Sequence, residues 1–285
     1  MIFNGVLDTD DQWDIVITRL SPNGDHLVGS TFLGGSGNDG LNFPKQSGGP
    51  LVVNYGDEMR GDVITDDTGN VYISSVTSSN NFPIVNGFDN TFNGSTTDGL
   101  VVKLAPDLSS IVWSSYLGGS GFDAAYSIKF DNDKNIVLAG GTTSTNFPVT
   151  PGSYQTTFNG IVDGWIARVA ANGNAIMNAT FTGTISFDQF LQKFLPDLSK
   201  VEFSTVFGSG TTSGLVIPNI SPTAFLVNDC DNIYMAGWGG FINSSPSTDF
   251  WQSNLPDYTI DLSIFSPSMY TLKIDGEKPM RIIKY

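Results

Sequence analysis

Two short turns in this 285-residue sequence carry closely spaced carboxylates and amides, whose oxygens are the ligands that Ca²⁺ prefers. Asp131, Asp133 and Asn135 place oxygens at alternate positions, and residues 229–232 repeat this spacing. Neither turn supplies the bidentate Glu or the roughly six oxygens of a tight calcium site. Because Asp and Asn also favour turns by bonding their own main chain, two interpretations stay open: a weak Ca²⁺ site at Asp131, Asp133 and Asn135, or plain turns.

Nucleophilic catalysis has few candidate residues here. The sole histidine, His26, falls in a predicted hairpin turn, and one histidine does not build an ordinary zinc site. The sole cysteine, Cys230, falls in a predicted turn with no histidine near it in sequence. The glycine-rich runs 34–37 and 118–121 lack the Lys-Ser/Thr pair and the following helix of a phosphate-binding loop. The sequence therefore predicts no catalytic residue, no enzyme activity and no cofactor beyond the weak Ca²⁺.

Acidic and aromatic residues at repeated positions have both a binding and a structural interpretation. Asp98 and Asp163 precede equivalent predicted strands, where they would either coordinate ions or accept backbone N–H bonds. We favour the second role, because a fold determinant recurs in each repeat whereas an enzyme site breaks the symmetry. Phe82 and Phe147, each followed by Pro, are expected to pack between neighbouring repeats.

Two tryptophans in the less regular part of the chain, Trp238 and Trp251, are the candidates for a carbohydrate-facing surface. A polysaccharide hydrolase or lyase is the alternative function. It would need two carboxylates roughly 5–10 Å apart, with an Arg or an aromatic residue beside them. The sequence alone does not place any two of the 28 acidic residues so close together.

The chain carries a net charge of −15, from 28 acidic and 13 basic residues. The sequence therefore predicts neither nucleic-acid binding, which needs a basic face, nor attraction to an anionic membrane. No apolar run reaches about 18 residues, so no membrane insertion is predicted. The first residues lack the basic and apolar regions of a signal peptide, which leads us to expect either a cytosolic protein or an internal piece of a longer one.

Internal repeats determine the predicted fold. Three separate segments recur, and in each case the second copy follows the first by 65 residues. The pairs are residues 66–73 and 131–138, 81–83 and 146–148, and 98–104 and 163–169. Three matches at one spacing point to a repeated structural unit rather than to chance.

Each full repeat contains four short strand candidates. In the first full repeat they fall at about 61–65, 71–77, 99–104 and 111–117, and they are rich in Val, Ile, Tyr and Trp. Asp-Asp-Thr-Gly-Asn joins the first pair and Ala-Pro-Asp-Leu-Ser-Ser the second, both of which are turn signals. The sequence thus predicts an all-β protein, a β-propeller of four-stranded antiparallel blades. A single β-sandwich is the alternative, but it would not need a repeated sequence.

We expect one domain over residues 1–285 with about five full or partial blades in an incomplete or irregular ring. The units fall at about 13–35 (partial), 61–119, 123–183, 187–209 (partial, lacking its first two strands) and 222–285 (degraded), with an insertion at 36–60.

Four motifs carry a resemblance to a known family. They are Gly-Asn-Val-Tyr at 69–72, Thr-Ser-Ser-Asn-Asn-Phe-Pro at 77–83, Asp-Gly-Leu-Val-Val-Lys-Leu at 98–104 and Trp-Ser-Ser-Tyr-Leu-Gly-Gly at 113–119. Together they resemble the SBBP family of β-propeller repeats, over roughly residues 13–240. The resemblance implies a secreted or cell-surface protein like those of gliding Bacteroidetes-type bacteria, which use type IX secretion and gliding motility.

By this resemblance the chain is expected to be extracellular, a non-enzymatic module for scaffolding, cell adhesion or ligand binding. Its expected partners are other domains of the parent surface protein, or extracellular glycans and proteins.

Overall fold

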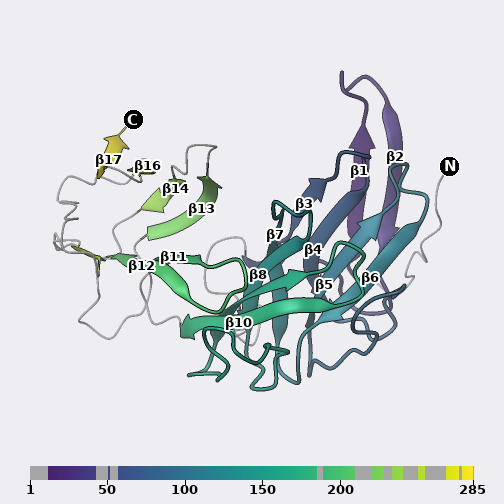
Figure 1. The fold of residues 1–285 in the computed structure, drawn as a ribbon. Coiled ribbons are helices and arrows are strands. Elements are labelled where there is room, and N and C mark those ends of the chain that lie inside the picture. Colours follow the sequence, from purple (N-terminus) through teal and green to yellow (C-terminus); the bar gives the residue numbers. More distant parts are fainter. Residues whose placement is uncertain are drawn as a thin grey trace. The chain divides into compact units, whose positions relative to one another are not determined.

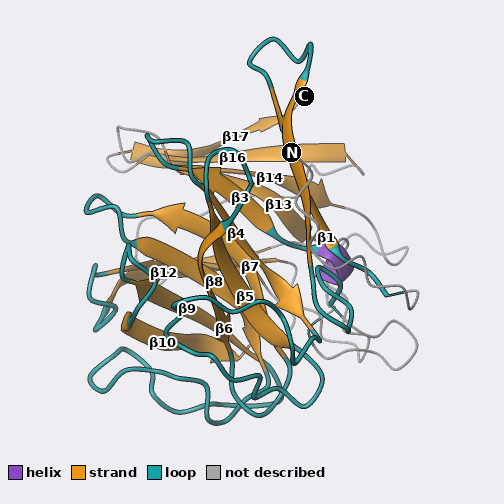
Figure 2. Cartoon of the chain, turned by 90° about the vertical axis from the view of Figure 1, so that its right-hand side faces the viewer, coloured by secondary structure: helices purple, strands orange, loops and turns teal. Residues whose placement is uncertain are grey.

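The computed structural model of the chain describes residues 12–42, 51, 57–184, 189–208, 220–227, 233–239, 250–253, 268–275 and 278–284. Within these ranges the structure is all-β, and its one helical segment is a single 3-10 turn at Asp57–Met59 (Figure 2). None of the described helical structure is long and apolar enough to cross a membrane. The chain divides into two compact units, residues 1–184 with 197–199 and the remainder, where the sequence predicts a single domain.

The first unit contains three antiparallel sheets that follow one another along the chain (Figure 1). Sheet A consists of β1 (Ile15–Leu20) and β2 (Leu27–Leu33). Sheet B has the order β3 (Asp62–Thr65), β4 (Val71–Thr77), β5 (Asp98–Leu104) and β6 (Ile111–Leu117). Sheet C has the order β7 (Asp123–Phe130), β8 (Ile136–Thr142), β9 (Asp163–Val169) and β10 (Ile176–Thr184).

The second unit contains two further antiparallel sheets. One has the order β11 (Gln189–Phe194), β12 (Val201–Gly208) and β15 (Phe250–Ser253). The other has the order β13 (Ile220–Val227), β14 (Ile233–Gly239), β16 (Ser268–Asp275) and β17 (Lys278–Lys284). The unit at 222–285 that the sequence treats as degraded therefore has four described strands in the same order as sheets B and C.

Sheets B and C share one pairing register. Val71 pairs with Leu104 in sheet B, and Ile136 pairs with Val169 in sheet C, each residue 65 positions further along. Val71 and Ile136 thus occupy matching positions in two separate sheets, rather than adjacent strands of one continuous sheet. The four-stranded antiparallel sheets predicted from the repeat are confirmed.

Sheet A repeats only the second half of this pattern. Val16 pairs with Phe32 as Leu100 pairs with Tyr116, 84 residues later. The register shift at Leu20 in β1 recurs at the matching place in β5. β1 and β2 are therefore the third and fourth strands of a sheet whose first two strands are absent from the described residues.

Both faces of sheet B pack against a neighbouring sheet. Ile73 packs with Leu33 of sheet A, whereas Tyr72, one position away, packs with Ile136 of sheet C. Successive side chains of a strand point to opposite faces, so sheet B lies between its two neighbours. Leu138 is the counterpart of Ile73 and again faces the preceding sheet.

The two Phe-Pro loops contribute to these contacts as predicted. Phe82 belongs to the core between sheets A and B, and Phe147 belongs to the core between sheets B and C. The ring of Phe147 stacks on Trp165 with centroids 4.9 Å apart. Each loop therefore seals the junction with the preceding sheet.

The insertion in sheet B is shorter than predicted. Asp39 forms an isolated bridge with Thr77, just as Asp123 pairs with Thr142 at the start of β7. Residues 36–39 therefore belong to the repeat, and the pairing of sheet B begins with the bridge at Asp39 and resumes at β3. The extra residues lie between Gly40 and Asp62.

Candidate functional site

A buried polar cluster joins each sheet of the first unit to the next. At the junction of sheets A and B, the carboxylate of Asp39 accepts hydrogen bonds from the backbone N–H of Gly35 (2.7 Å), the hydroxyl of Ser79 (2.7 Å) and the hydroxyl of Thr77. The Ser79 hydroxyl in turn accepts a bond from the N–H of Gly37 (2.8 Å). The backbone N–H groups of the glycine-rich turn thus donate to side chains of the protein itself, among them the carboxylate of Asp39.

The same cluster recurs between sheets B and C. Asp123 accepts bonds from the N–H of Gly119 (2.8 Å) and the hydroxyl of Ser144 (2.7 Å). The N–H of Ser120 donates to the side-chain oxygen of Asn146 (2.8 Å), as Ser36 does to Asn81 in the first copy. Because both copies have the same partners, the cluster is a determinant of the fold at each junction.

A second carboxylate approaches each cluster from the preceding sheet. Asp98 is fully buried, and its Oδ2 accepts a bond from the N–H of Asn93 (2.8 Å). Asp163 makes the equivalent bond with the N–H of Asn159 (2.8 Å), so these acids do accept the backbone bonds expected of a fold determinant. The other oxygen of Asp98 lies against the α-carbon of Gly118, close to Asp123.

Burial shifts the proton affinity of these acids. It raises the pKa of Asp98 to about 7, with the negative charge of Asp123 adding to the effect and the N–H groups of Asn93 and Gly94 partly offsetting it. Burial also raises the pKa of Asp123 and of Asp39. Each of these buried acids therefore holds its proton more tightly than an exposed acid does.

The close approach at Gly118 leaves no room for a side chain. A β-carbon there would lie 2.8 Å from Oδ2 of Asp123 and still closer to Asp98. We expect Gly118→Ala to lower the free energy of unfolding by about 2 kcal/mol, because the two carboxylates must move apart. Urea denaturation measures this loss. Gly141→Ala is the control, since its nearest neighbour is the flexible end of Leu51 at 3.2 Å; an equal effect in both variants would contradict the steric explanation.

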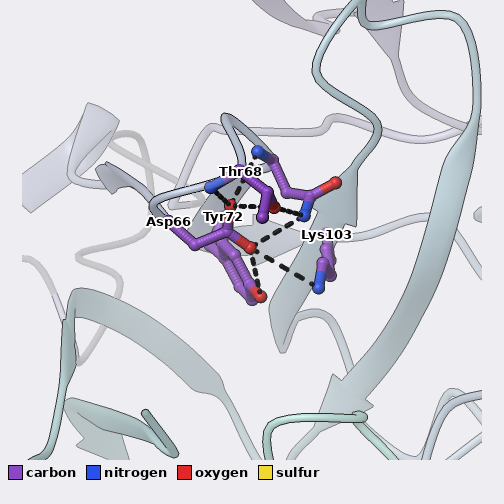
Figure 3. A network of polar contacts seen from close by, with 5 residues as sticks. Asp66, Thr68, Tyr72 and Lys103 are labelled. Atoms are coloured by element: carbon purple, nitrogen blue, oxygen red, sulfur yellow. Dashed lines mark hydrogen bonds and ion pairs between the residues drawn. The ribbon is translucent and has the colours of Figure 1, made fainter.

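A different polar network closes the first hairpin turn of sheet B (Figure 3). Asp66 accepts bonds from Thr68, from Asn70 and from the hydroxyl of Tyr72 (3.1 Å), and Lys103 lies 3.7 Å away. Burial alone would raise the pKa of Asp66, but the bonds from Asn70 and Thr68 outweigh it and hold the pKa well below the ordinary range. The carboxylate is therefore ionised and satisfied by its own turn.

The equivalent turn of sheet C contains the predicted calcium ligands. Arg168 on β9 donates to Asp131 (2.5 Å) and to Asp133 (3.0 Å), while Asn135 bonds Asp131 through its backbone N–H (2.8 Å). Burial raises the pKa of Asp131, but the hydrogen bonds from Arg168 and Asn135 lower it by more than burial raises it. The net shift of the pKa is therefore downward. The guanidinium of Arg168 thus supplies the positive charge that lies beside both carboxylates. No group of three or more His, Cys, Asp or Glu side chains in the described part of the chain is placed to hold a metal ion.

The other predicted site residues are dispersed. His26 lies in the β1–β2 hairpin turn, where its Nδ1 contacts Asp25 at 2.7 Å. Trp238 lies within β14, paired on both sides with Ser221 and Met269, rather than in irregular structure. Trp251 lies in β15; the side chains of both tryptophans, like Cys230, fall outside the described residues.

A groove that the sequence did not single out runs beside β1. Two adjoining cavities of about 420 and 560 Å³ lie between β1 and β3, and both are lined by Ile17 and Val63. Trp13 is exposed at one end and Arg19 lies at the other. The sequence feature that could have indicated this groove is the partial unit at 13–35, because a sheet with only two described strands has a strand edge without a described partner.

A scan against protein-family models and a search of curated proteins found no match for this chain.

Proposed function

We propose that this chain is a non-enzymatic β-propeller repeat module of a secreted or cell-surface protein, acting as a scaffold for adhesion or ligand binding. The observation that carries the propeller is the identical stacking of successive sheets. Sheet A covers one face of sheet B, and sheet B covers the same face of sheet C. Sheets that repeat one face-to-face contact with the next sheet are the units from which a propeller is built.

The outer face of sheet A supports further stacking. Val16 is 55% exposed and Phe32 38%, whereas their counterparts Leu100 and Tyr116 in sheet B are no more than 1% exposed. The positions keep their apolar character although nothing in the described residues covers them. A further sheet of the same type on this face would bury them, as sheet A buries those of sheet B.

The polysaccharide hydrolase remains the less favoured proposal. The close carboxylates Asp98 and Asp123 have raised pKa values, as a catalytic pair would, but both are fully buried and bonded to the fold. The same arrangement recurs with Asp14 and Asp39 around Gly34. A pair that recurs at successive junctions fits structural acids, whereas a catalytic pair is needed at one place only.

Turnover and binding assays test this function. We expect the purified chain to leave the length distribution and reducing ends of a panel of acidic and neutral polysaccharides unchanged, while a glycan and matrix-protein array reports saturable binding. Cleavage that scales with protein concentration and disappears in Asp98→Asn would contradict the proposal. Antibody labelling of intact cells of the source organism tests the surface location, and an experimental structure whose sheets share no central axis would refute the propeller.

A further inference from the structure

The edge of β1 that borders the groove has no strand partner among the described residues. In sheets B and C the equivalent edge is occupied along its whole length. Seven residues of β4 pair with β5, from Val71 opposite Leu104 to Thr77 opposite Asp98, and β8 pairs with β9 in the same register. β1 therefore presents the backbone N–H and C=O groups that a second strand would pair.

The groove also leaves an apolar residue of sheet B uncovered. Val63 on β3 is 55% exposed, although its counterpart Ile128 on β7 is fully buried. Ile128 is covered by Tyr72 and Ile64 of the β3–β4 hairpin. Because the described part of sheet A contains no matching hairpin, no described side chain of such a hairpin covers Val63, and the cavities mark the space that it would fill.

Arg19 on β1 is a positive charge that can pair with an acidic residue of a hairpin docked on β1. Its counterparts are Lys103 on β5 and Arg168 on β9, which contact Asp66 and Asp131 in the first hairpin turns of their own sheets. Arg19 instead donates to the backbone oxygen of Pro106. An Asp at the turn of a hairpin docked on β1 would lie where Asp66 and Asp131 lie, and would pair with Arg19.

We propose that the groove beside β1 binds a β-hairpin of this same repeat type, one that belongs to none of the described sheets. Its second strand pairs antiparallel with β1, from a first residue opposite Leu20 to a seventh opposite Asp14. Its inward apolar side chains fill the space over Val63, and the Asp that begins its turn pairs with Arg19. Strand addition at an open edge gains affinity from main-chain bonds and specificity from side-chain pockets. The inference rests on the observed repeat and is independent of the proposed surface role.

A peptide with the sequence of residues 123–142, the complete first hairpin of sheet C, is the probe. It carries a fluorophore at its N-terminus and is titrated against the full chain while anisotropy is recorded. We expect saturable binding with a dissociation constant of roughly 1–100 µM, and a rise in Tm of the full chain at saturating peptide. A scrambled peptide of the same composition is expected not to bind.

Three variants locate the binding. Val63→Glu is expected to weaken it at least tenfold, and Arg19→Gln several-fold, whereas Val112→Glu on β6 is expected to leave it unchanged. Val63 and Val112 are both exposed strand valines, at 55% and 41%, so neither change should disturb the fold, and the circular dichroism of each variant checks this. No saturable binding at about 1 mM peptide, or equal binding by Val63→Glu, would overturn the proposal. A stable dimer of the chain that Val63→Glu dissociates would overturn it too, because a second copy would then be the occupant.

Discussion

The variant Asp123→Ala is expected to lose about 3 kcal/mol of unfolding free energy. The carboxylate is fully buried and accepts from the Gly119 N–H and the Ser144 hydroxyl. Removing it leaves two buried donors without an acceptor, and each such donor costs about 1–3 kcal/mol. Relief of the repulsion with Asp98 offsets part of this loss.

Two measurements separate this effect from a general loss of packing. Urea denaturation gives the change in the free energy of unfolding. Hydrogen exchange measured by mass spectrometry gives the exchange rates of the turn at 118–122 and of the loop at 142–147 that contacts it. Faster exchange is expected in these two segments first. Asp67→Ala is the control, because Asp67 is 87% exposed and its ion pair with Lys134 is expected to contribute little. A loss below about 0.5 kcal/mol in Asp123→Ala would show that the cluster does not hold the sheets together.

The repeat spacing was enough to predict the four-stranded sheets B and C and the matching positions of residues 65 apart. A residue such as Val71 and its copy Ile136 share the same strand pattern and the same turn before it, so local propensity and tertiary pairing agree. The start of the predicted insertion at 36–60 was placed too early, because residues 36–39 follow a different spacing of 84, as Asp39 and Asp123 show. The bridge of Asp39 with Thr77 and the bond of Ser36 with Asn81 show that these residues belong to the repeat.

The polar clusters were beyond sequence reasoning for a physical reason. Asp98 and Asp123 meet only because consecutive sheets stack, and no local pattern reports that approach. The turn at Asp131 left a weak Ca²⁺ site and a plain turn open, because the sequence does not show that Arg168, remote in sequence and adjacent through the β8–β9 pairing, contacts Asp131. Trp238 and Trp251 remain predictions, because their side chains lie outside the described residues.

Stability is expected to fall as the pH rises from about 4 to 7. The folded-state pKa of Asp98 is about 7, against 3.8 for the unfolded chain. Between these values the folded state keeps a proton that the unfolded state has released, so raising the pH favours unfolding. The contribution is fully present below pH 4, is lost as the pH passes 7, and amounts to at most about 4 kcal/mol. Asp123 and Asp39 are shifted in the same direction and add to the trend.

The pKa values of Asp66 and Asp131 are shifted in the opposite direction, and they affect stability over a different pH range. Their lowered pKa values contribute stability above about pH 4 and lose it as the medium becomes more acidic, so they do not cancel the fall between pH 4 and 7.

Asp98→Asn isolates the titration of the buried acid, because an amide keeps an oxygen that can accept from the N–H of Asn93 and carries no charge at any pH. We expect this variant to have a flatter profile of urea midpoint against pH from 4.5 to 7.5, and to match or exceed the parent chain at pH 7.5. Asp67→Asn, on the exposed turn, should keep the parent slope. If Asp98→Asn keeps that slope as well, the proton is held elsewhere, and the charge repulsion between the stacked sheets is relieved by some other group.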